Sequence, residues 1–148
     1  MISSDDPKLL TSQALRPRVV GADKNCVLLV EDDPSLRRLL EIILERGKYR
    51  YLSAGDGMEA IDVLRENRIA LVITDAFMPN LNGYELCRWM KENEAVAHIP
   101  IVLLSALDPE PVEMDHADEF LTKPVAPDDF LACVARWISD HRSQISDP

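Results

Sequence analysis

The chain has 148 residues, of which 47% are hydrophobic, so it can bury one core and is too short for two ordinary domains. Its 26 acidic and 16 basic residues give a formal net charge of -10, which argues against direct contact with a nucleic-acid backbone. We therefore expect a single domain that binds no nucleic acid directly.

The cysteines and the apolar runs bear on the cellular compartment. The three cysteines lie inside apolar or helical stretches without the close paired spacing of a zinc site, and their odd count fits a disulfide framework poorly. No segment approaches the roughly 18 consecutive apolar residues that span a bilayer, and the N-terminus lacks the basic start of a signal peptide. We expect a cytoplasmic protein without membrane insertion.

The folded part of the chain is expected to begin near residue 25. Residues 1–24 mix polar residues, proline and glycine without a sustained period, which indicates a flexible N-terminal extension. Periodic apolar segments then follow one another over residues 25–140, and residues 141–148 form a polar C-terminal tail. We therefore predict one domain over residues 25–140.

The first unit of this domain is a strand followed by a helix. Residues 26–30 form a continuous apolar run, which suits a strand buried on both faces of a sheet. Asp33 can cap a helix that starts at Pro34, because proline is tolerated at the first helical position. Apolar residues at helical spacing continue as far as Gly47: Leu36, Leu39, Leu40, Ile43 and Leu44.

The same alternation of strand and helix continues along the chain. Apolar runs predict further strands over residues 49–53, 69–74, 99–104 and 119–122. Helical spacing of apolar residues predicts helices after Gly57, over residues 84–91 and from Pro127. Because this order requires right-handed crossovers, we predict an α/β fold with a doubly wound, five-stranded parallel sheet.

Polar residues stand where four of the predicted strands end: Glu31 and Asp32, Asp75, Ser105, and Lys123. Ligands of such sheets bind outside the carboxyl ends of the strands. Three carboxylates that meet there would repel one another without a cation among them, and hard oxygen ligands suit Mg²⁺. Asp75 can then act as a nucleophile toward a phosphoryl group, with Lys123 neutralising charge and Ser105 donating a hydrogen bond.

Four sequence motifs carry a family resemblance. They are Val30-Glu31-Asp32-Asp33-Pro34-Ser35-Leu36-Arg37, Asp75-Ala76-Phe77-Met78-Pro79 with Asn82-Gly83, Ser105-Ala106, and Phe120-Leu121-Thr122-Lys123-Pro124. In this order and spacing, the chain resembles a receiver domain of the bacterial two-component response regulators over about residues 25 to 140. The resemblance implies the flavodoxin-like (βα)5 fold of that family.

The resemblance also implies a role for each matching residue. Asp75 corresponds to the phosphoacceptor, which becomes a 4-aspartylphosphate, and Glu31 and Asp32 correspond to the acidic pair that binds Mg²⁺. The backbone carbonyl of Phe77 corresponds to the third protein ligand of the metal. Lys123 corresponds to the phosphate-contacting lysine, followed by a cis peptide to Pro124. With this register, Asp33 is mainly a helix cap.

The family switch couples Ser105 to an aromatic residue, here Phe120, which lacks the phenol that many members have. The segment between these two residues is about one helical turn shorter than in the family, and Pro109 and Pro111 restrict where its helix starts. We therefore expect a shortened or irregular fourth helix of the (βα)5 fold. Since many family members dimerise or meet their targets through this region, its shortening weakens the prediction of the usual dimer.

The expected function is that of a stand-alone receiver similar to the single-domain chemotaxis regulators. It would take a phosphoryl group from a histidine kinase or a histidine phosphotransfer protein and be read by a downstream protein target. It would catalyse only its own phosphorylation and dephosphorylation. This hypothesis leaves open whether the chain is a fragment of a larger regulator.

Three alternatives remain at this stage. A phosphorelay shuttle would pass the group on to a histidine phosphotransfer protein. A phosphohydrolase with an aspartyl-phosphate intermediate would also need a carboxylate, Mg²⁺, a hydroxyl and a lysine, but it normally has a second aspartate where this chain has Phe77. A degenerate receiver would act as a constitutive docking module.

Overall fold

The computed structural model describes residues 26–106 and 117–146, with side chains described as far as Ile138. The strands are β1 (Cys26–Val30), β2 (Arg50–Ala54), β3 (Leu71–Asp75), β4 (Ile101–Ser105) and β5 (Glu119–Thr122). The helices are α2 (Pro34–Arg46), α3 (Gly57–Glu66), α4 (Gly83–Lys91) and α5 (Pro127–Ser146).

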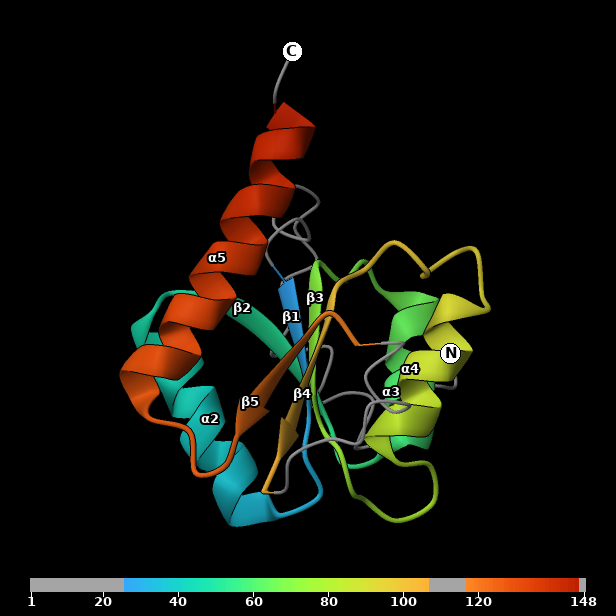
Figure 1. Ribbon diagram of the computed structural model, residues 1–148, viewed down its shortest axis with the longest axis horizontal. Coiled ribbons are helices and arrows are strands. Elements are labelled where there is room, and N and C mark those ends of the chain that lie inside the picture. Colours follow the sequence, from blue (N-terminus) through green and yellow to red (C-terminus); the bar gives the residue numbers. More distant parts are fainter. Residues whose placement is uncertain (1–25, 107–116, 147–148) are drawn as a thin grey trace, which may run out of the picture.

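All five strands belong to one parallel sheet, in the order β2-β1-β3-β4-β5 (Figure 1). The predicted doubly wound α/β fold is confirmed. β2, β3 and β4 each start and end one or two residues later than the apolar runs predict, so Asp75 and Ser105 are the last residues of their strands. The order reverses between β1 and β3, which places the switch point of the sheet at the ends of these strands.

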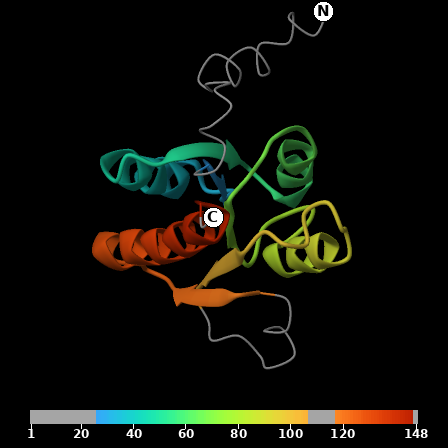
Figure 2. The same cartoon turned by 90° about the horizontal axis from the view of Figure 1, so that it is seen from above.

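Within residues 26–106 and 117–146, two helices cover each face of the sheet. Figure 2 shows α2 and α5 on one side and α3 and α4 on the other. Alternate side chains of β1 enter the two cores: Leu28 and Val30 pack with α3 and α4, whereas Val27 and Leu29 pack with α2 and α5. Because β1, β3 and β4 are buried along their whole length, their sequences are apolar rather than alternating.

The helices differ from the sequence pattern in one detail. Leu39 was predicted on the apolar face of α2 but is 53% exposed, because the buried face is formed by Leu40, Ile43 and Leu44. All three cysteines are buried, and burial raises the pKa of the Cys87 and Cys133 thiols to about 12. None of the helices among the described residues is long and apolar enough to cross a membrane.

Three predictions concern the ends of the domain and the segment before β5. The N-terminal extension over residues 1–24 lies outside the described residues, as does most of the predicted shortened fourth helix, over residues 107–116. Helix α5 continues to Ser146, so the backbone is helical within the residues predicted as a polar tail. The domain bounds stay predictions.

Candidate functional site

The predicted site residues gather at the carboxyl edge of the sheet, toward which the strand arrows of Figure 1 point. Glu31 directly follows β1, Asp75 ends β3, Ser105 ends β4 and Lys123 directly follows β5. Since β1, β3, β4 and β5 are consecutive neighbours in the sheet, these four strand ends lie side by side. The structure therefore brings together residues as far as 92 positions apart in the sequence.

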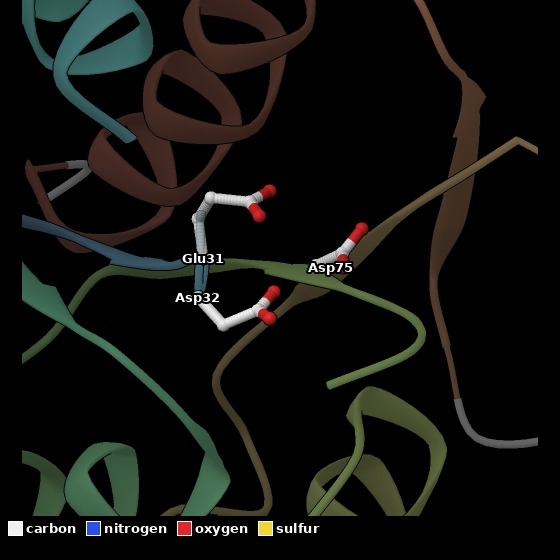
Figure 3. Close-up of side chains that lie close together, drawn as sticks. All are labelled: Glu31, Asp32 and Asp75. Atoms are coloured by element: carbon white, nitrogen blue, oxygen red, sulfur yellow. The ribbon is translucent and has the colours of Figure 1, made fainter. Parts of the chain in front are cut away.

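The three acidic side chains form a tight cluster. Glu31, Asp32 and Asp75 each offer a carboxylate oxygen, and these oxygens all lie within 4.8 Å of one another (Figure 3). Glu31 is 1% exposed and Asp75 6%, whereas Asp32 is exposed. Burial raises the pKa of both the Glu31 and the Asp75 carboxyl group, and the neighbouring carboxylate adds to each shift. The cluster concentrates negative charge where water is scarce.

Lys123 supplies the positive charge of the site. Its Nζ lies 2.5 Å from Asp75 Oδ1 and 3.4 Å from Glu31 Oε1. Burial lowers the pKa of the Lys123 ammonium, but the contacts with Asp75 and Glu31 outweigh burial and raise this pKa overall. Its backbone N–H donates to the Ser105 carbonyl at 2.8 Å, and the peptide to Pro124 is cis, as the resemblance implied.

Ser105 and Phe120 lie on neighbouring strands and share one face of the sheet. Ser105 is 3% exposed, and Phe120 is paired with Leu103, two residues before Ser105 on β4. Because side chains alternate along a strand, Ser105, Leu103 and Phe120 point toward the same face. Phe120 is partly buried and packs with the core that α3 and α4 cover. The two predicted switch residues therefore lie on adjacent strands and on one face of the sheet, offset by two residues along the strands.

The turn between β1 and α2 is fixed by local hydrogen bonds. Asp33 Oδ1 accepts from the backbone N–H of Ser35 at 2.9 Å and of Leu36 at 3.4 Å, so the predicted helix cap is confirmed. Arg37 Nη1 donates to the Glu31 carbonyl oxygen at 2.7 Å. Sequence reasoning assigned no role to Arg37, because a backbone acceptor six residues away leaves no signal in residue type or spacing.

The loop between β3 and α4 carries Phe77. The Phe77 ring is 55% exposed and contacts the Tyr84 ring edge-on, with centroids 5.7 Å apart. Both ends of the loop are held by backbone hydrogen bonds, from Ala76 N–H to the Leu104 carbonyl and from Gly83 N–H to the Ala76 carbonyl. Phe77, whose backbone carbonyl would provide the third metal ligand, therefore lies two residues after Asp75 in a loop that hydrogen bonds hold at both ends.

The donor set fits a divalent metal ion. Three carboxylates meet here with one ammonium, so one unit of positive charge faces three of negative charge. Carboxylate oxygens are the ligands that Mg²⁺ prefers, and the cluster lies at the edge of the sheet rather than in its sealed core. Glu31, Asp32 and Asp75 are the described residues that would hold Mg²⁺, and the bound ion would complete the charge neutralisation that Lys123 begins.

A five-stranded, doubly wound sheet that gathers an acidic cluster, a serine and a lysine at its carboxyl edge defines a receiver domain. Residues 27–135 match the response regulator receiver domain family. The chain belongs to this family of two-component signalling proteins, whose members accept a phosphoryl group on an aspartate in the presence of Mg²⁺.

Curated relatives are response regulators. The chain is 34% identical over 118 residues to the transcriptional regulatory protein GltR of Pseudomonas aeruginosa, a match that covers 76% of this chain and 48% of GltR. It is 26% identical over 118 residues to the polar-differentiation response regulator DivK of Brucella anthropi, covering 77% of this chain and 96% of DivK. The matched region thus spans about half of GltR and nearly all of DivK.

Solved structures show the same fold. The receiver domain of a signal transduction histidine kinase from Syntrophus aciditrophicus is 35% identical, with a TM-score of 0.72 over 78% of this chain and 91% of that one. The receiver domain of a Pseudomonas aeruginosa sensor histidine kinase, solved with a magnesium ion in its active-site cleft, is 27% identical, with a TM-score of 0.72 over 78% of this chain and 98% of that one.

Proposed function

We propose that this chain is the phosphoacceptor of a two-component or phosphorelay pathway and takes a phosphoryl group from a histidine kinase or histidine phosphotransfer protein onto Asp75. The observation that carries the proposal is the Lys123 ammonium, which lies 2.5 Å from Asp75 within a cluster of three carboxylates. A structural ion pair does not need two further carboxylates beside it, whereas a phosphoryl acceptor with a metal site does.

In the proposed reaction, a carboxylate oxygen of Asp75 attacks the phosphorus atom of a phosphohistidine. The new O–P bond forms as the N–P bond breaks, and the bonding electron pair leaves with the imidazole, which takes up a proton. Lys123 moves its contact from the Asp75 carboxylate to an oxygen of the arriving phosphoryl group. Mg²⁺ held by Glu31, Asp32, Asp75 and the Phe77 carbonyl would neutralise phosphoryl charge.

We further propose Ser105 and Phe120 as the switch that reports phosphorylation. The Ser105 hydroxyl would turn toward the phosphoryl group, and the Phe120 ring, which shares its face of the sheet, would move into the space behind it. Amide spectra recorded with and without beryllofluoride and Mg²⁺ check this step. Shifts at Ser105 and Phe120 are expected, and their absence would indicate a constitutive docking module.

Labelling of Asp75→Asn tests the phosphoacceptor. The parent protein should acquire one phosphoryl group from acetyl phosphate in the presence of Mg²⁺, and the variant should acquire none, as measured by intact-protein mass spectrometry. Asp33→Asn is the matched control, because asparagine caps a helix as well as aspartate does and Asp33 lies outside the cluster. Undiminished labelling of Asp75→Asn would overturn the assignment.

The partners of the phosphorylated form follow from the same proposal. A downstream protein target in the cytoplasm would read the switch surface, and a relay shuttle would instead hand the group on to a histidine phosphotransfer protein. Incubating labelled protein with candidate phosphotransfer proteins separates the two roles. Loss of the label from Asp75 with gain on a histidine indicates the shuttle, and retention of the label indicates the signalling module.

A further inference from the structure

Two loops meet beside the acidic cluster. One is the turn between β2 and α3, which ends at Asp56, the residue before Gly57 at the start of α3; the other is the loop between β3 and α4, which contains Asn80 and Leu81. Asn80 Nδ2 donates to Asp56 Oδ2 at 2.7 Å, across 24 positions of sequence. The Gly57 N–H donates to the Leu81 carbonyl at 3.1 Å. The second loop is therefore held to the first by a side-chain and a backbone hydrogen bond.

The two carboxylate oxygens of Asp56 accept hydrogen bonds from different segments. Its Oδ1 accepts from the Glu59 N–H at 2.9 Å, which caps the start of α3. Its Oδ2 accepts from the Asn80 amide. The side chain that caps the start of α3 therefore also binds the loop that follows Asp75. The rigid start of α3 resists any movement of that loop.

The geometry of the contact leaves little freedom on either side. Asn80 has a φ of 69°, a left-handed conformation that asparagine adopts more readily than most residues. A Cβ atom on Gly57 would lie 2.4 Å from the Leu81 carbonyl oxygen, so the two backbones approach each other as closely as glycine allows. The close approach therefore requires glycine at position 57, and asparagine suits the backbone conformation at position 80.

We propose that Asp56 and Asn80 are positioning residues for the phosphoacceptor site. Their hydrogen bond holds the β3–α4 loop, and this would fix the place of the Phe77 backbone carbonyl relative to the metal position at Glu31 and Asp32. Neither residue touches the phosphoryl group. This inference rests on the proposed function, because it assigns the two residues a role in metal binding and phosphorylation rather than in folding alone.

Two single variants remove this hydrogen bond and spare the other tasks of each residue. Asp56→Ser keeps an oxygen that caps α3 but is too short to reach Asn80 as well. Asn80→Gly keeps the left-handed backbone and loses the amide. Each variant should bind Mg²⁺ about tenfold more weakly, the size typical of losing a partner that orients metal ligands, as measured by calorimetry.

A swapped pair tests the hydrogen bond itself. In Asp56→Asn combined with Asn80→Asp, donor and acceptor exchange places, the helix cap keeps an oxygen, and the net charge is unchanged. This double variant should regain most of the parent's Mg²⁺ affinity and phosphorylation rate. In the metal-free protein, the Gly57 amide hydrogen should exchange faster with solvent in both single variants and return toward the parent rate in the swapped pair.

The outcomes separate this inference from the function on which it rests. If the parent binds Mg²⁺ and is labelled on Asp75 but both single variants keep its Mg²⁺ affinity, the positioning role is wrong and the proposed function stands. Weaker Mg²⁺ binding that the swapped pair does not restore also overturns the positioning role. If the parent neither binds Mg²⁺ nor becomes labelled, both proposals are wrong.

Discussion

At the scale of single residues, Lys123 is the counter-charge of the site. Its folded-state pKa lies above the ordinary value of 10.5, so the stability that its ion pairs contribute is fully present below about pH 10.5. That stability is lost as the pH rises through the raised pKa. At neutral pH, the ammonium therefore offsets the charge of Asp75 and Glu31 in the metal-free protein.

Removing this charge should change metal binding and phosphorylation in opposite directions. Lys123→Met should bind Mg²⁺ about threefold to tenfold more tightly, because repulsion between the ammonium and the metal ion is lost. Its labelling by acetyl phosphate should fall, because no ammonium meets the phosphoryl oxygens. Calorimetry and mass spectrometry measure the two effects.

Lys91→Met is the matched control for that prediction. Its ammonium pairs at 3.5 Å with Asp118, which also accepts from the backbone N–H of Ile101 at the start of β4. The pair therefore lies at the amino end of the strands, the opposite edge from the cluster. The same loss of charge should leave Mg²⁺ affinity nearly unchanged there. Weaker Mg²⁺ binding by Lys123→Met would contradict the electrostatic account.

At the scale of elements, helix α4 begins directly against the phosphoacceptor strand. Asn82 and Glu85 form a capping box, in which each side chain accepts from the backbone N–H of the other residue, at 2.9 and 2.8 Å. Gly83, which follows Asn82, lies so close to β3 that a Cβ atom on it would be 2.3 Å from the Asp75 carbonyl oxygen. The start of α4 and the end of β3 thus constrain each other.

Gly83→Ala tests this contact, because helix propensity and packing predict opposite signs. Alanine in place of glycine within a helix stabilises by about 1 kcal/mol. Here the added methyl group meets backbone, which cannot move aside as a flexible side chain can, and overpacking of this kind costs about 1–3 kcal/mol. We expect the cost of overpacking to exceed the gain in helix propensity, so Gly83→Ala should lower the free energy of unfolding in urea by up to about 2 kcal/mol.

The control for this substitution is Gly55→Ala. The nearest atom to its added Cβ is a carboxylate oxygen of Glu59 at 3.4 Å, which is an ordinary contact distance. Gly55→Ala should therefore change the free energy of unfolding much less than Gly83→Ala. A Gly83→Ala protein as stable as the parent would show that β3 and α4 can separate at no cost.

At the scale of the whole molecule, the site makes stability depend on pH and metal together. Burial raises the folded-state pKa of Glu31 and Asp75 above the ordinary values of 4.5 and 3.8. The folded protein then binds more protons than the unfolded chain between each ordinary pKa and the raised one. In this window the contribution of the two groups to stability falls as the pH rises. The metal-free domain thus carries an electrostatic cost at neutral pH.

Mg²⁺ should reverse this dependence, because it binds the deprotonated carboxylates of the folded protein. We expect added Mg²⁺ to raise the midpoint of thermal unfolding at pH 7–8, and removal by a chelator to cancel the gain. The gain should shrink as the pH falls into the range of the raised pKa values, above the pH at which ordinary carboxyl groups titrate. A gain that stays constant down to the ordinary values would contradict the raised pKa values.

The layers of the fold and the polar residues at the strand ends can be read from the sequence alone. Continuous apolar runs at β1, β3 and β4 reflect burial on both faces, and helical spacing between them reflects one-sided burial, so the doubly wound sheet follows from periodicity. The end of each apolar run predicts the end of a strand. The polar residues at those ends are therefore expected to lie together: the acidic residues, Ser105 and Lys123. The cap by Asp33 was predictable because its partners are two and three residues away.

Which loops meet, and how closely, is visible only in the folded structure. Periodicity says which side of an element is buried, but not what packs there, so it placed Leu39 on the wrong side and said nothing of the bond from Arg37 to the β1–α2 turn. The contact between Asp56 and Asn80 spans 24 positions and depends on where two crossovers bring their loops. Residue types record local conformation and burial, whereas contacts between distant loops arise only when the whole sheet is assembled.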